Sequence, residues 1–73
     1  MTGLPRISGR KCVAALSKIG FQFKRQNGSH IILRRAAPFG QVVVPDHKEI
    51  DNGTLRGIVR QAGLSVEEFI ALL

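Results

Sequence analysis

Acidic residues are missing from the first 45 of the 73 positions of the chain. That segment carries eight Lys or Arg, whereas residues 46–73 carry three basic and five acidic residues, so the net charges of the two parts are +8 and −2. A one-sided surplus of positive charge attracts polyanions, of which nucleic acid is the first candidate. The alternative is a soluble basic surface without a specific partner.

Long apolar runs and paired cysteines are also missing. No run approaches the roughly 18 residues of a membrane span. The start of the chain, MTGLPRISGRK, has no apolar signal-peptide core, so we expect a cytoplasmic location. Cys12 is the single cysteine, which excludes an intrachain disulfide and a cysteine metal site. Two histidines and scattered acids do not form a metal-site pattern, and we expect no bound metal.

The length of the chain limits the kind of site that it can build. A chain of 73 residues should form one domain, residues 1–73, that buries only about 60% of its unfolded surface. A deep pocket for a large cofactor is hard to build at this size, and no phosphate-binding glycine loop of nucleotide enzymes is present. We therefore expect no cofactor, and any chemistry should lie on a surface or in a shallow groove.

Apolar spacing and turn residues predict the order of secondary structure. A helix is expected over about residues 8–19, because Ser8 can cap it, an apolar stripe has helical spacing, and Gly20 can end it. The stripe consists of Cys12, Val13, Leu16 and Ile19. Three short strands are expected in FQFKRQ, SHIILRR and QVVV, with AAPFG linking the last two.

Two further helices are expected after these strands. TLRGIVRQA has one apolar face and ends near Gly63, and Ser65 with Glu68 forms a capping box for a short last helix. A three-stranded meander needs cover on at least one face. The sequence therefore predicts an α+β fold of two layers, α-β-β-β-α(α), with a three-stranded antiparallel sheet and helices on one face.

The phase of the strands predicts the face on which His30 lies. His30, Ile32 and Arg34 point one way along their strand, and Ile31 and Leu33 point the other. A two-residue turn at Asn27-Gly28 would place the phenylalanines of the first strand on the His30 face. A three-residue loop, Gln26-Asn27-Gly28, pairs Lys24 with His30 and keeps all the large apolar side chains together. We choose the three-residue loop, because one apolar face is worth several burials of about 1.5–3 kcal/mol each.

The open face then carries Lys24, His30 and Arg34, with Arg25 and Arg35 close by in sequence. Arginine and lysine bind phosphates, and a histidine titrates near neutral pH. RNA supplies its own nucleophile, the 2′-hydroxyl, so one histidine and nearby cations suffice for a slow, metal-free ribonuclease. The alternative is that His30 is a solvent-facing strand residue without a functional role.

The remaining candidates have structural interpretations as well. Gly28 and Ser29 are turn residues, although Ser29 has a hydroxyl and an amide to offer to phosphate. His47 is a possible second acid–base group, but a loop histidine beside an aspartate is more often simply exposed. Cys12 lies in an apolar stripe, so a core position is expected rather than a nucleophile. We predict Lys24, Arg25, Gly28, Ser29 and Arg34 as RNA-binding residues.

Several stretches resemble the HicA toxin family of HicA–HicB toxin–antitoxin systems when they are taken in order. They are GSH after a basic strand, VPDHKEI, the helix start GTLRGIVRQAGLS, and EEF near the end. The resemblance implies a fold like a double-stranded-RNA-binding domain and a metal-independent mRNA-cleaving activity, that of an mRNA interferase. It maps the catalytic histidine onto His30. Positions 36–41 form a variable loop and contribute nothing to it.

The resemblance also implies a HicB antitoxin that neutralises the toxin. Such a partner should cover the open face, with Ile32 as an anchor, or block His30, and an acidic contact surface would gain association rate from the basic half. Two other functions stay open. One is a non-catalytic RNA-binding module that reads duplex shape, and the other is an interaction subunit that only holds a partner.

Overall fold

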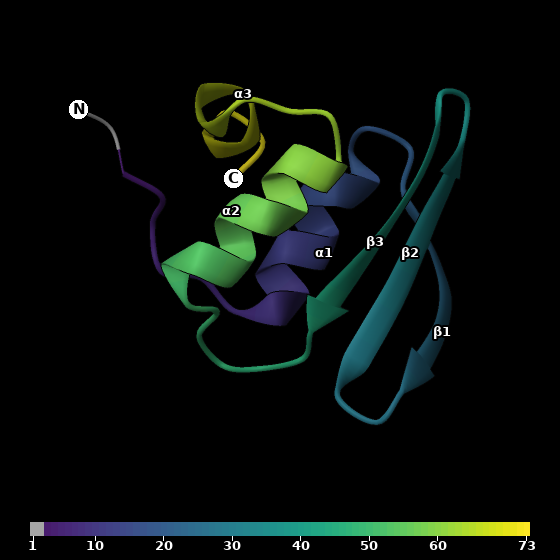
Figure 1. Ribbon diagram of the computed structural model, residues 1–73, viewed down its shortest axis with the longest axis horizontal. Helices are drawn as coiled ribbons and strands as arrows, with labels where there is room; N and C mark the ends of the chain where they lie inside the picture. The colour runs from purple at the N-terminus through teal and green to yellow at the C-terminus, as the bar shows by residue number, and fades with distance from the viewer. Residues whose placement is uncertain (1–2) are drawn as a thin grey trace.

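Three antiparallel strands and three helices make up residues 3–73, the part of the chain that the computed structural model describes. The elements follow in the order α1 (Gly9–Ser17), β1 (Gln22–Asn27), β2 (His30–Ala36), β3 (Phe39–Pro45), α2 (Asn52–Gln61) and α3 (Val66–Ile70). The sheet has the order β1-β2-β3, and the helices lie on one side of it (Figure 1). The predicted α+β order is confirmed.

The helix boundaries come from the expected capping residues. Ser8 Oγ accepts a hydrogen bond from the Lys11 backbone N–H, and Ser65 and Glu68 form the reciprocal capping box of α3. Gly20 follows α1 with a φ of +98°, a conformation that L-residues other than glycine rarely adopt. Helix α1 ends at Ser17, somewhat before the expected residue 19.

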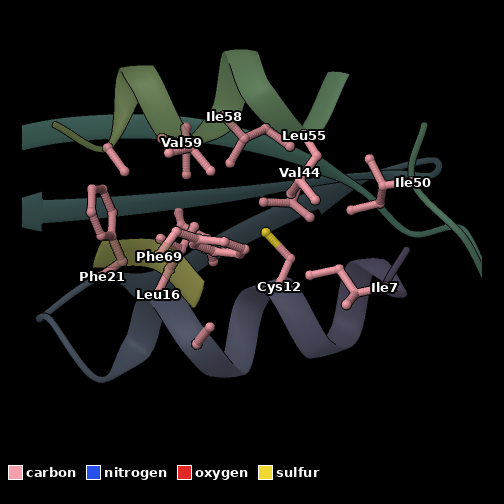
Figure 2. Packing of buried hydrophobic residues seen from close by; sticks show 14 of the residues in the cluster. Ile7, Cys12, Leu16, Phe21, Val44, Ile50, Leu55, Ile58, Val59 and Phe69 are labelled. Atoms are coloured by element: carbon pink, nitrogen blue, oxygen red, sulfur yellow. The ribbon is translucent and has the colours of Figure 1, made fainter. Parts of the chain in front are cut away.

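One apolar core lies between the helices and the inner face of the sheet (Figure 2). Every side chain of this core that lies on β2 or β3 comes from the same alternating set of positions. The fully or almost fully buried members include Cys12, Leu16, Phe21, Ile31, Leu33, Val42, Val44, Leu55, Ile58, Val59 and Phe69. Because this set excludes His30, Ile32 and Arg34, the opposite face of the sheet is the open one.

Cys12 is a buried core residue, as expected from its place in the apolar stripe. Burial raises the pKa of the Cys12 thiol to about 12. Since the thiolate is the reactive form, we expect the folded protein to react with a disulfide reagent far more slowly than the denatured protein at the same mildly alkaline pH. Equal reaction rates for the two states would show that Cys12 is exposed, and the release of the reagent's chromophore measures both.

The β1–β2 hairpin has a different register from the expected one. Asn27 pairs with His30, so the loop is a two-residue turn of Gly28 and Ser29, and Lys24 does not pair with His30. The φ of Gly28 is +62°, as a tight turn with glycine at its first central position requires. The predicted three-residue loop is therefore wrong.

A β-bulge provides the extra residue that keeps the apolar side chains of β1 and β2 on the same face. The predicted three-residue loop would have provided this residue in the turn. The register shifts between Phe23, which pairs with Leu33, and Arg25, which pairs with Ile32. Lys24 is the unpaired residue of this bulge. Phe23 thereby stays on the side of the buried Leu33, although the turn at the tip of the hairpin has only two residues.

Strand β1 extends beyond the helix layer, as Figure 1 shows at the side of the sheet away from α1 and α2. Helices α1 and α2 pack against β3, and all six residues of β1 are exposed. Phe23 points to the helix side of the sheet but remains 58% exposed. The expected burial of Phe23 is wrong, because the helices of residues 3–73 pack mainly against β3 and leave this part of the sheet largely uncovered.

Candidate nucleic-acid interface

His30 is the first residue of the central strand and lies on the open face of the sheet. It is flanked across the sheet by Asn27 on β1 and by Pro45 on β3. The residue is exposed, and no side chain among residues 3–73 hydrogen-bonds to its ring. The imidazole is therefore accessible to a ligand that approaches this face.

Cations lie further along the same face. Arg25 is opposite Ile32, and Arg34 is on the His30 side of β2. The Arg34 guanidinium donates from Nε and Nη2 to Oε1 of Gln41, at 3.1 and 2.9 Å, which fixes it across β2 and β3. Within residues 3–73 the ion pairs involve Arg6 and Arg10, so the cations of the sheet have no acidic partner.

Arg35 has a different role from its neighbour Arg34. Its guanidinium lies 4.5 Å from the centre of the Phe21 ring on the helix side of the sheet. It donates to backbone carbonyls of Ile19, Pro38 and Ala62, so it joins β2 to the ends of two helices. Arg35 thus stabilises the fold, and the cations of the open face are Arg25 and Arg34 with Lys24 at the bulge.

Asp46 holds the tip of the His30 hairpin in place, a role that the sequence did not reveal. Its backbone N–H donates to the Ser29 carbonyl at 2.6 Å, and its Oδ2 accepts from Gln26 Nε2 at 3.2 Å. Its Oδ1 lies 3.4 Å from Nε of Arg10 on α1. The one available signal was position, because Asp46 is the first acid after the acid-free segment.

His47 lies at the same end of the molecule as His30. His47 comes two positions after Pro45, the residue that pairs with His30. The backbone carbonyl of His47 accepts a hydrogen bond from the Gly9 N–H at 2.8 Å. The side chain is exposed. The contact with α1 therefore fixes the backbone of His47 near the His30 end of the sheet.

The predicted RNA-binding residues divide into two groups in the structure. Arg25, Arg34 and the bulge residue Lys24 lie along the strands, whereas Gly28 and Ser29 form the turn immediately before His30. The carbonyl of Gly28 accepts from Gln26 Nε2 and that of Ser29 from the Asp46 N–H. These bonds order the turn, and they leave the Ser29 side chain exposed.

Two further features concern ligands and membranes. Nowhere in residues 3–73 do three or more His, Cys, Asp or Glu side chains gather as a metal ion would require. No helix of this part of the chain combines the length and the apolar character needed to cross a membrane.

Fold and surface together define a class of protein, a small α+β domain whose open sheet face is basic and carries an accessible histidine. The family model described as HicA toxin of bacterial toxin–antitoxin matches residues 9–64. The chain belongs to this family and is the toxin of a toxin–antitoxin system, which implies an antitoxin partner. The comparison with curated proteins found no match.

Proposed function

We propose that this toxin is an endoribonuclease that binds and cleaves mRNA in the cytoplasm on the open face of its sheet, with His30 as the general acid or base. One observation carries the proposal. His30 is exposed on the same uncovered face as Arg25 and Arg34, and residues 22–45 contain no acid that would repel phosphate. Family membership supports the same function, because HicA toxins are generally of the ribonuclease type.

The residues of this face match what cleavage of RNA requires. The 2′-oxygen attacks the adjacent phosphorus as its proton leaves, and the P–O5′ bond breaks as the 5′-oxygen gains a proton. The products are a 2′,3′-cyclic phosphate and a 5′-hydroxyl. His30 serves one of the two proton transfers, and His47 is a candidate for the other. Arg25 and Arg34 stabilise the negative charge that develops on the phosphate. This stabilisation is strongest where one arginine donates two hydrogen bonds to the phosphate oxygens.

The test compares RNA with a modified RNA of the same sequence. In EDTA, we expect the purified protein to cleave the RNA and to leave its 2′-O-methyl analogue intact, because the analogue has no hydroxyl to attack phosphorus. Gel electrophoresis of end-labelled RNA measures both reactions. Addition of a HicB antitoxin that binds the toxin should stop the cleavage by covering the His30 face.

Other outcomes would assign a different function. A protein that binds RNA with strong salt dependence and never cleaves it would be an RNA-binding module. Cleavage that disappears in EDTA would contradict the metal-independent mechanism.

A further inference from the structure

The outer edge of β1 is a free sheet edge. Strand β1 is terminal in the order β1-β2-β3, and within residues 3–73 it pairs with β2 alone. All of its residues, Gln22–Asn27, are exposed. Backbone N–H and C=O groups on such an edge are available to another chain that approaches in an extended conformation.

A groove runs beside this edge on the helix side of the sheet. It has a volume of about 270 Å³ and lies between α1 and the uncovered part of β1. Its apolar wall is formed by Val13, Phe23 and Ile31, and its polar end by Arg10, Gln26 and Asp46. The polar groups at that end are paired with one another. The surface that lacks a partner is therefore the apolar wall, and Phe23 is the most exposed side chain of this wall.

Charge decides which occupant fits the groove. An extended segment beside β1 would direct alternate side chains to the groove and to the opposite face, where Arg25 lies. A second copy of this chain is disfavoured, because full antiparallel overlap of Gln22–Asn27 with itself would place Lys24 opposite Arg25, and like charges directly opposite are destabilising. The unpaired cations favour an acidic partner.

From these observations we propose that an extended segment of the antitoxin, in which acidic and apolar residues alternate, docks along the edge of β1. Its apolar side chains enter the groove over Phe23, and its carboxylates pair with Lys24 and Arg25. The inference rests on the antitoxin partner that family membership implies, and it is independent of RNA cleavage. The bulge and the two cations would then select against wrong partners at this edge.

The probe is a short labelled peptide in which Glu alternates with Val, and fluorescence anisotropy measures its binding to the full chain. We expect Phe23→Ser to weaken binding roughly tenfold or more, as for an anchoring aromatic residue at an interface. Phe39→Ser is the matched control, because Phe39 is 72% exposed and lies away from the groove at the β2–β3 turn. A peptide with Lys in place of Glu should bind far more weakly.

Any of the following results would contradict the proposed docking site. No binding of the acidic peptide, or equal losses for Phe23→Ser and Phe39→Ser, would exclude the groove as its site. If Phe23→Ser weakened RNA binding and left peptide binding unchanged, the groove would take RNA. Because peptide binding does not require catalysis, a failure of RNA cleavage leaves this test unaffected.

Discussion

Replacement of His30 by alanine should lower the rate of RNA cleavage by about 10²–10⁴-fold, the usual contribution of a general acid or base. The cations of the open face, Arg25 and Arg34, remain in this variant. RNA affinity and its dependence on salt should therefore stay close to those of the wild type. Single-turnover cleavage with excess protein, in EDTA, separates the chemical step from binding.

Thermal unfolding of His30→Ala provides the control for this experiment. Within residues 3–73 the ring has no hydrogen-bond partner and is exposed, so its removal should hardly change stability. A folded variant that cleaves as fast as wild type would remove His30 from the mechanism. A variant that loses RNA affinity to the same extent as cleavage would make His30 a binding residue.

Gly9→Ala should destabilise the protein by about 1–3 kcal/mol, as expected for overpacking of a close contact. A Cβ at position 9 would lie 2.0 Å from the carbonyl oxygen of Pro45 and 3.1 Å from Cα of Asp46. Both are backbone atoms at the C-terminal end of β3 and just after it, so no side-chain rotation can relieve the contact. We also expect slower RNA cleavage, because Pro45 pairs with His30 and Asp46 holds the hairpin tip.

Gly57→Ala is the matched control for this substitution. Gly57 lies within α2, and in the described part of the chain no atom beyond its chain neighbours and the backbone of α2 lies within 4 Å of a Cβ built there. Alanine at an unhindered helix position should stabilise the fold by about 0.5–1 kcal/mol. Chemical denaturation measures both variants. Changes of the same sign in the two would contradict the close packing of α1 against the Pro45–Asp46 backbone.

Local sequence signals were sufficient to predict the order of elements and the face of His30. Helix capping by Ser8 and Ser65 involves only residues that are close in sequence, and so does the end of α1 before the left-handed Gly20. Such local effects can be predicted from the sequence. The apolar phase of the strands requires one extra residue between Phe23 and Ile31. Phase does not specify its position, however, and the structure places it in the bulge at Lys24 rather than in the turn.

Contacts between distant segments were the part that the sequence could not predict. Asp46 meets Gln26, 20 positions earlier, and Arg10 on α1, and these contacts exist only once the fold has formed. The exposure of Phe23 has a similar cause, because it depends on how far the helix layer extends over the sheet. The alternation of apolar residues indicated which side of the sheet Phe23 faces. It did not indicate whether a helix packs over the Phe23 side chain.

The most direct test of His30 as an acid–base group is chemical rescue of His30→Ala by imidazole. We expect free imidazole to restore cleavage of RNA in EDTA in proportion to its concentration, because it supplies the missing proton-transfer group. It should leave the wild-type rate unchanged. Undiminished cleavage by His30→Ala without imidazole, or no restoration at any imidazole concentration by a variant that is folded and binds RNA, would contradict this role.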